Sequence, residues 1–502
     1  MSGLPEANDS IAQRSAAALG WSWAGSATRA LLQFVVQVLL ARWLGPEAFG
    51  QAAAALLVIG LASLVAEAGL SSALIQRAAL DEHDVAVALG RLLLISAAVS
   101  LLVAVLAGPI ASWLGDARLV TLVLASAIIV PLQALSQLPA ALLQRRLQVK
   151  RLQAIQLVSY GLGYAVIGLS LALAGAGPWS VLAAFAAHAL IVMVLCWASV
   201  RHSLKPQLSG SGVLRDYARG VLWANLVNWA VESVDRLIVS RGWGAAALGE
   251  YALAGNLSRA PVTLLVSSAQ PVAFASASRL QNESDRVARG YLAVLSLALL
   301  LSLPLFAFLA WHAAWVVQLL YGERWAGAAA PFAVMCLGVP FFVMLALTGP
   351  MLRGVDAVAS ETRAQLAVLL GLVVALSWLG GQSLVVVATV VALATALRAL
   401  VLYLALARRI ALAPGAWWQA WRGGLLLAAV VLVVSWATHL LQPAWGATAP
   451  SLLAAAAATL LCLMLLRASR GALFGAALYQ ALRNRREDSR VARRLCAWAG
   501  MP

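Results

Sequence analysis

Apolar stretches of about 20 residues recur along this chain from Ala16 to Leu466, and they constrain its fold more than any other feature. A helix of about 20 apolar residues crosses the roughly 30 Å hydrocarbon core of a bilayer. Of the 502 residues, 63% are hydrophobic and 11% are charged, which is far more apolar than the composition of a soluble domain. The sequence therefore predicts an all-α, polytopic membrane protein.

The apolar stretches predict about fourteen transmembrane helices, joined by short loops without an inserted soluble domain. The expected spans are residues 16–40, 51–76, 86–113, 119–143, 153–174, 178–200, 218–240, 246–275, 290–311, 326–350, 364–380, 383–407, 421–441 and 448–466.

The 35 Lys and Arg residues indicate the orientation of these spans. If the N-terminus is cytoplasmic, 27 of them lie in cytoplasmic segments and four on the other side, while four fall inside spans: Arg29, Arg236, Arg259 and Arg398. Because basic residues concentrate in cytoplasmic loops, we expect both termini to be cytoplasmic. The net charge of +16 does not indicate a nucleic acid, since the basic residues punctuate apolar runs and form no patch interleaved with aromatic residues.

A short motif occurs twice at an offset of 199 residues. Residues 42–51 (RWLGPEAFGQ) and 241–250 (RGWGAAALGE) share one Arg and two Gly at matching positions. Six expected spans separate the copies, so both have the same topology, which indicates a parallel repeat about an axis along the membrane normal. We therefore expect two six-helix lobes, residues 1–204 and 205–410, then two additional helices in 411–466 and a basic cytoplasmic tail in 467–502.

Two expected helices carry matched polar stripes. In the first span the polar residues recur every three or four positions and stay within a stripe of about 80°: Ser22, Ser26, Arg29, Gln33 and Gln37. In the seventh span they fall within about 100° of one another: Asn225, Asn228, Glu232, Asp235 and Arg236. Such faces avoid lipid, so the stripes predict a central polar cavity that includes these residues.

Charged side chains inside spans need partners or water. For Arg236, an i, i+4 salt bridge with Glu232 competes with a role in substrate binding, whereas Arg29 has no acid within a turn and is the stronger binding candidate. Arg259 is a third candidate cation. Glu67 is either a structural pair near the end of its span or an ion-coupling carboxylate.

Further polar positions in the fourth and fifth spans fit either sugar binding or hydrogen bonding between helices: Gln133, Gln137, Gln144, Gln153, Gln156, Tyr160 and Tyr164. His188, the one histidine of its expected span, is more typical of a core residue. The four cysteines have no paired spacing and indicate reduced packing residues without a metal. The sequence contains no phosphate-binding Gly-rich loop ending in Lys, no H-E-x-x-H and no G-x-S-x-G, so we expect neither an enzyme nor a cofactor.

Five stretches in a fixed order carry a family resemblance: ARWLGP with FG at 41–50, EAGL with ALIQR at 67–77, LLQR at 142–145, LGEY with Ala254 and Pro261 at 248–261, and LYGERW at 320–325. They resemble the Wzx-type polysaccharide flippases of the multidrug/oligosaccharidyl-lipid/polysaccharide exporter superfamily, most of all the colanic-acid-exporter branch. Asp235 matches a frequent acidic position of the family's seventh helix. Glu67 stands where the family often has Asp.

The resemblance implies a pair of lobes around a cationic cavity and, as substrate, an oligosaccharide linked to undecaprenyl diphosphate, moved across a bacterial inner membrane by alternating access. In that interpretation Arg29, Arg236 and Arg259 bind the diphosphate. Gln33, Gln37, Asn225 and Asn228 complete the substrate site, and Glu232, Asp235 and Glu67 are candidates for ion coupling. Membrane lipids, a glycan polymerase and a chain-length regulator are the implied partners. The alternatives are a cation-coupled multidrug exporter, a lipid II flippase, and a non-transporting scaffold of a glycan-assembly complex.

Overall fold

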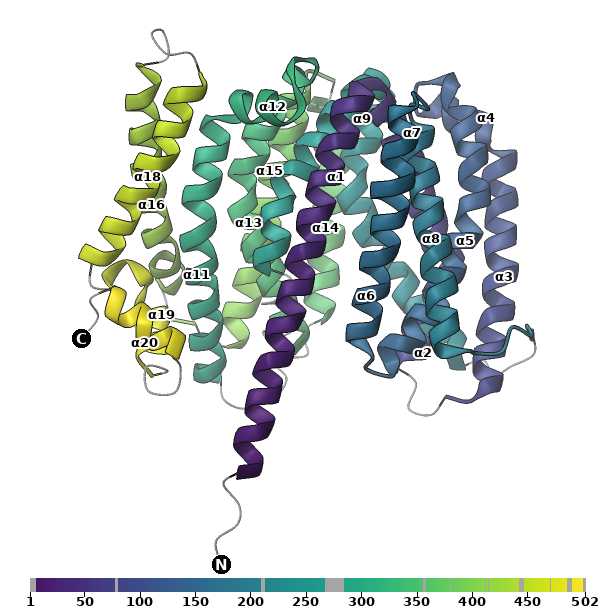
Figure 1. The fold of residues 1–502 in the computed structure, drawn as a ribbon, viewed down its shortest axis with the longest axis horizontal. Coiled ribbons are helices and arrows are strands. Elements are labelled where there is room, and N and C mark those ends of the chain that lie inside the picture. Colours follow the sequence, from purple (N-terminus) through teal and green to yellow (C-terminus); the bar gives the residue numbers. More distant parts are fainter. Residues whose placement is uncertain are drawn as a thin grey trace, which may run out of the picture. The chain divides into compact units, whose positions relative to one another are not determined.

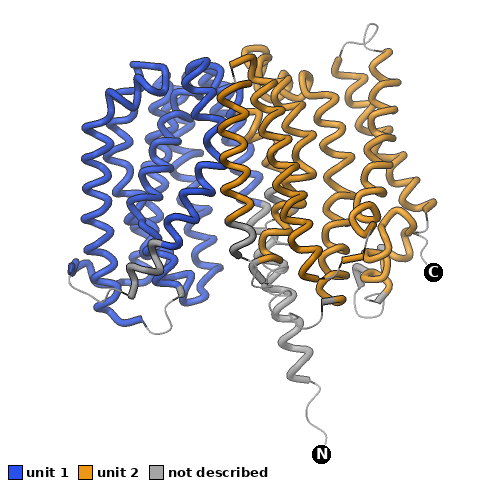
Figure 2. The backbone as a smooth tube through the Cα atoms, turned by 180° about the vertical axis from the view of Figure 1, so that it is seen from behind, with its two compact units in different colours: residues 1–252 blue, residues 253–502 orange. Residues whose placement is uncertain are grey.

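The chain folds into helices throughout the part that its computed structural model describes, which comprises residues 6–76, 80–208, 213–266, 284–354, 358–379, 381–410, 412–413, 415–441, 447–469, 471–484 and 490–499 (Figure 1). Contacts divide it into two compact units, Met1–Ala252 and Leu253–Pro502 (Figure 2). This division lies inside one helix and does not test the lobe boundaries expected from the repeat, which remain predictions.

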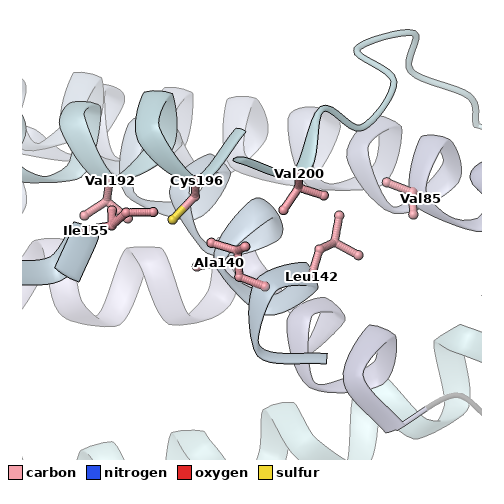
Figure 3. Packing of buried hydrophobic residues seen from close by; sticks show 8 residues of the cluster. Val85, Ala140, Leu142, Ile155, Val192, Cys196 and Val200 are labelled. Atoms are coloured by element: carbon pink, nitrogen blue, oxygen red, sulfur yellow. The ribbon is translucent and has the colours of Figure 1, made fainter. Parts of the chain in front are cut away.

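The described residues of the first unit form eleven elements. They are α1 (Glu6–Glu67), α2 (Leu70–Gln76), α3 (Glu82–Val105), α4 (Ala107–Trp113), the 3-10 helix η1 (Ala117–Leu119), α5 (Val120–Arg145), α6 (Val149–Tyr160), the π-helix η2 (Gly161–Gly168), α7 (Leu169–Leu173), α8 (Trp179–Val200) and the larger part of α9 (Val213–Val266). Helix α5 is central, because it packs against α1, α3 and α8. Its inward residues join those of α3, α6 and α8 in one apolar cluster that includes Val85, Leu142, Ile155 and Cys196 (Figure 3).

The second unit continues with α11 (Ser284–Trp311), α12 (Ala313–Tyr321), η3 (Glu323–Ala328), α13 (Ala329–Gly354), α14 (Val358–Leu379), α15 (Leu384–Arg409), α16 (Ala416–His439), α18 (Thr448–Ala468), η4 (Ala472–Phe474), α19 (Ala476–Asn484) and α20 (Arg490–Trp498). Helix α11 packs against α13 and α16, and α18 packs against α16. The predicted tail is therefore helical in its described part, and α19 lies against α11.

Helices α1 and α9 each contain two arms joined at a glycine. Gly45 has φ 74° and ψ 172°, and Gly244 has φ 76° and ψ −169°. This region of backbone space is essentially open to glycine alone, so each glycine ends one arm and starts the next. The two breaks are 199 residues apart, so the repeat seen in the sequence has a matching backbone geometry.

The two copies of the motif also contact each other symmetrically. A Cβ atom on Gly50 would lie 1.7 Å from the carbonyl oxygen of Ala245, and one on Gly249 would lie 2.0 Å from that of Pro46. Ala245 and Pro46 occupy the same place in their copies, as do the two glycines. Both glycines are therefore needed for backbone to approach backbone at this point.

The turn of α9 is fixed to the end of α4. Ser240 Oγ donates to the carbonyl of Leu114 at 3.0 Å, and the guanidinium of Arg241 lies 5.4 Å from the ring centroid of Trp113. Beside it, Asp116 accepts hydrogen bonds from Arg118 and Gln51. Burial alone would raise the pKa of Asp116, but these hydrogen bonds outweigh it, so that pKa lies below its usual value.

In the described residues the expected spans lie largely on helices, but their count of fourteen is not confirmed; residues 267–275 of the span 246–275 and residue 380 of the span 364–380 lie outside the described residues. Ten helices of the described part are long and apolar enough to cross a membrane. The difference arises partly because α1 joins two expected spans and α9, with its charged residues, is not among the ten. The expected helix 51–76 is wrong in one respect: it is broken at Ala68 and Gly69, which have positive φ, and α2 follows. The segment after Arg201, where the two expected lobes join, is partly anchored, since the main-chain N–H of Gln207 donates to the carbonyl of Ala86 in α3 at 3.0 Å.

Candidate functional site

The polar stripe of α1 lies against α6. Arg29 is half-buried and donates from Nη1 to Gln153 Oε1 at 3.5 Å, and Gln33 and Gln37 are also half-buried. This contact is longer than the usual N–H···O range of about 2.7–3.2 Å and is therefore weak. Gly45 ends the arm 16 residues later, so Arg29 lies about 24 Å along the helix from the break, within the expected span. The side chains of Ser22 and Ser26 are outside the described residues.

An aromatic cluster continues from Arg29 along α6. Tyr160 and Tyr164 stack with ring centroids 4.6 Å apart, and His188 of α8 lies edge-on, 6.2 Å from Tyr160. Tyr164 belongs to the π-helix, where Gly163 permits close approach of α8: a Cβ there would lie 2.8 Å from the carbonyl oxygen of Ala184. Nδ1 of His188 is buried and has no hydrogen-bond partner among the described residues. The two tyrosines of the fifth expected span therefore pack against each other and against His188 of α8, and their suggested roles in sugar binding or hydrogen bonding between helices stay predictions.

Most side chains in the polar stripe of α9 are exposed. Asn225, Asn228 and Glu232 are exposed, and Arg236 is half-buried. An amide exposed to hydrocarbon loses its hydrogen bonds to water at a cost of several kcal/mol, on the order of the transfer cost of an amide to an alkane. This face of the helix is therefore suited to water or to a polar ligand.

Arg236 is held by its own helix. Its Nη2 donates to the main-chain carbonyl of Glu232 at 2.8 Å and to Ser233 Oγ at 3.1 Å. The guanidinium thus contacts the backbone of the residue that the sequence suggested as its ion-pair partner. Both bonds leave from one nitrogen, and a guanidinium has five N–H donors.

Asp235 joins the two arms of α9. Tyr251 Oη donates to Asp235 Oδ2 at 2.8 Å, and the main-chain N–H of Arg236 donates to Oδ1 at 2.8 Å. Asp235 and Tyr251 are both buried, and Gly244 lies between them in sequence. Both carboxylate oxygens therefore accept hydrogen bonds inside the protein. The periodicity of the sequence placed Asp235 on the polar stripe but gave no sign of this partner.

Glu67 lies apart from these residues in the sequence and has a local contact. Glu67 is the last residue of α1 and accepts a hydrogen bond from Ser71. Nearby, Arg145 Nη1 donates to the carbonyls of Leu74 and Ile75 and so caps α2; these residues belong to two of the stretches that carry the family resemblance.

In the second unit, the guanidinium of Arg259 lies 5.4 Å from the ring centroid of Phe342. Its side chain is exposed, as a substrate-binding cation requires.

An apolar groove of about 550 Å³ adjoins α9 in the first unit. The second arm of α1, α3 and α4 provide most of its lining, including Leu61, Leu102 and Ile110, and α9 contributes Trp229 and Leu237. The lining contains no charged residue and only the indole nitrogens as polar side-chain atoms. Sequence reasoning missed this groove, because its lining residues come from four helices.

The family described as "Polysaccharide biosynthesis protein" matches residues 39–330, more than half of the chain. The chain belongs to this family. The succinoglycan biosynthesis transport protein ExoT of Rhizobium meliloti (strain 1021) is 26% identical over 343 residues, which cover 67% of this chain and 68% of ExoT. The teichuronic acid biosynthesis protein TuaB of Bacillus subtilis (strain 168) is 25% identical over 295 residues, 57% of this chain and 58% of TuaB, so that match spans less than two thirds of the relative.

Solved structures share the fold. The lipid II flippase MurJ, in an inward closed conformation, matches with a TM-score of 0.72 at 14% identity, over 91% of this chain and 98% of that one. An inward-facing multidrug resistance MATE family transporter of the MOP superfamily matches with a TM-score of 0.62 at 15% identity, over 76% and 94% of the two chains. The predicted polysaccharide-biosynthesis family is confirmed by the family match, and the solved structures confirm the fold.

Proposed function

We propose that this member of the polysaccharide biosynthesis family is a flippase, a transporter without enzymatic activity. Its substrate is an oligosaccharide repeat unit linked through diphosphate to a polyprenyl lipid such as undecaprenol. The protein moves this unit from the cytoplasmic to the periplasmic face of the inner membrane, for exopolysaccharide, capsule or O-antigen synthesis. The names of relatives such as ExoT, a biosynthesis transport protein, support this function.

The observation that carries the proposal is the meeting of polar and apolar surfaces on α9. Trp229 lines the apolar groove, and Arg236 follows it by seven residues. Seven residues turn a helix almost twice, so the two side chains leave it within about 20° of each other and about 10 Å apart along the axis. A ligand with an ionic head and a long hydrocarbon chain fits such a surface, whereas an organic cation of a drug exporter does not need the long groove.

The candidate cations suit a diphosphate. Guanidinium groups form paired hydrogen bonds with phosphate oxygens. The contact between Arg29 and Gln153 is weak, and the bonds of Arg236 use one nitrogen, so in this proposal both can turn N–H groups to the substrate. Arg259 is the third cation, while Gln33, Gln37, Asn225 and Asn228 provide amide contacts to sugar hydroxyls. Glu232, Asp235 and Glu67 remain the candidates for ion coupling; the exposed Glu232 fits that role better than Asp235, whose oxygens are both engaged.

In the cell we expect a multi-pass inner-membrane protein with both termini in the cytoplasm, beside the glycan polymerase and chain-length regulator. A reporter that is active only in the periplasm should be silent when fused after Pro502. Strong activity of that fusion would contradict the orientation derived from the basic residues.

The test of the function uses a bacterial strain that lacks its own flippase and accumulates lipid-linked repeat units at the cytoplasmic face. Expression of this chain should make the sugars accessible to periodate added outside the cells. Efflux of the cationic dye ethidium is measured in the same cells. Dye efflux without sugar exposure would support a drug exporter instead. Correct insertion with neither activity would contradict the flippase and favour the scaffold.

A further inference from the structure

A second pocket, of about 500 Å³, lies wholly inside the second unit, where the end of α11, the start of α12, the end of α16 and the first turn of α18 meet. Its polar and aromatic lining consists of Trp311, His312, Trp315, His439 and Ser451, and the remaining lining residues are alanines. None of them is Asp, Glu, Lys or Arg. The basic residues of the sequence assign this end of α11 to the extracytoplasmic side.

The proton positions around His312 follow from Ser451. Ser451 Oγ donates its one proton to the carbonyl of Ala447 at 2.7 Å and lies 3.0 Å from His312 Nδ1. With its proton used, the hydroxyl must accept from Nδ1–H. Burial, and then the neighbouring His439, lower the pKa of His312, so the ring is neutral. Nε2 of His312 is therefore a hydrogen-bond acceptor.

Two polar atoms of this pocket lack partners. His312 is 4% exposed, and its Nε2 has no hydrogen-bond partner among the described residues; the same holds for the buried Nε1–H of Trp315. One is an acceptor and the other is a donor. Buried polar atoms left unpaired are costly, so such a pair indicates a missing partner.

The chemistry of that partner is restricted. An ionised phosphate or carboxylate has no proton to donate to His312 Nε2. A metal ion cannot accept a hydrogen bond from the indole N–H of Trp315. A hydrocarbon chain can neither donate nor accept. A hydroxyl group, whether of water or of a ligand, both donates and accepts. The uncharged lining favours a neutral ligand, the indole of Trp311 is partly exposed beside it, and the volume is within the usual range for small-molecule sites.

We propose that this pocket binds a sugar residue through its hydroxyl groups. None of the lining residues is among those proposed to carry the substrate, and the site needs no transport to be occupied. It would recognise glycan at the extracytoplasmic end of the second unit.

The test measures binding to the purified full-length protein in detergent without added lipid, by saturation-transfer difference NMR. The probes are the methyl glycosides of glucose, galactose and N-acetylglucosamine, with glycerol and tetrahydropyran as comparisons. At least one glycoside should bind. Trp315→Phe keeps an aromatic ring but removes the N–H, so affinity should fall about fivefold, the effect of about one hydrogen bond. The matched control is Trp378→Phe, because Trp378 of α14 is 86% exposed and does not line the pocket.

Several results would overturn the proposal. Absence of transfer to every glycoside would do so, as would equal binding in wild type and Trp315→Phe. Equal signals from tetrahydropyran, which has the ring but no hydroxyl group, would show apolar contact alone, and equal signals from glycerol would indicate a lipid headgroup. Displacement of the glycoside by Zn²⁺ in wild type but not in His312→Phe would indicate a metal site. If Trp315→Phe does not fold, Ser451→Ala replaces it. Without the Ser451 hydroxyl, the proton of His312 is no longer held on Nδ1, so Nε2 is a poorer acceptor and binding should weaken. Because binding is measured without transport, its failure leaves the flippase test unaffected.

Discussion

Replacing Gly50 by alanine tests the contact between the two copies of the repeat. The added Cβ would lie 1.7 Å from the carbonyl oxygen of Ala245, whereas carbon and oxygen atoms in close contact stay about 3.3 Å apart. The two segments must therefore separate by about 1.6 Å. Both sides of the clash are main chain, so no side-chain rotation relieves it.

Overpacking of this kind typically destabilises a protein by about 1–3 kcal/mol. Gly249→Ala makes the symmetric clash, 2.0 Å from Pro46, and should cost a similar amount. Because either substitution pushes the same two segments apart, the double variant should cost less than the sum of the two. The assay is thermal unfolding of the detergent-solubilised protein, followed by size-exclusion chromatography with fluorescence detection.

Gly242→Ala is the matched control. Gly242 lies in the same motif, and a Cβ there would meet no atom within 4 Å. Its melting temperature should equal that of the wild type or rise slightly. If Gly50→Ala and Gly242→Ala melt at the same temperature, the close approach of the two copies does not exist in the membrane protein.

Three further predictions concern the candidate site. Arg29→Ala should reduce glycan export about 10- to 100-fold at normal membrane abundance, and Arg29→Lys should restore part of it, since an ammonium keeps the charge but loses the planar fork; normal export per molecule by the Ala variant would remove Arg29 from the site. A single cysteine in place of Asn228 should react with a membrane-impermeant thiol reagent faster than one in place of Val227, and equal rates would contradict a water-filled face. Tyr251→Phe removes the hydroxyl that donates to the Asp235 carboxylate, so it should lower the free energy of unfolding by about 1–3 kcal/mol. In an Asp235→Asn background the acceptor is neutral, so the same substitution should cost less. Equal costs in both backgrounds would show that the two side chains are not coupled.

Much of the fold follows from local features of the sequence. The helix positions were predictable because about 20 apolar residues cannot stay in water and must satisfy their backbone hydrogen bonds in the membrane. The glycines of the repeat were recognisable as a pattern, and Gly45 and Gly244 now have a cause in their backbone angles. Hydropathy could not predict the break at Ala68, because an apolar residue that leaves the helix keeps the same hydropathy as one inside it.

The site was predictable only as far as a single helix determines it. A helical wheel places Asn225, Asn228 and Glu232 on one face, and their exposure agrees with that placement. The same wheel puts Asp235 beside them, yet the chain reverses at Gly244 and brings Tyr251 back onto its carboxylate.

The pocket at His312 was even less predictable from the sequence. Ser451, which hydrogen-bonds to His312, lies 139 residues away on α18. A polar residue in a membrane helix is available to substrate only if no residue from a distant part of the sequence already forms its hydrogen bonds. Periodicity can find the residues that need a partner, and three-dimensional structure is required to see which of them already have one.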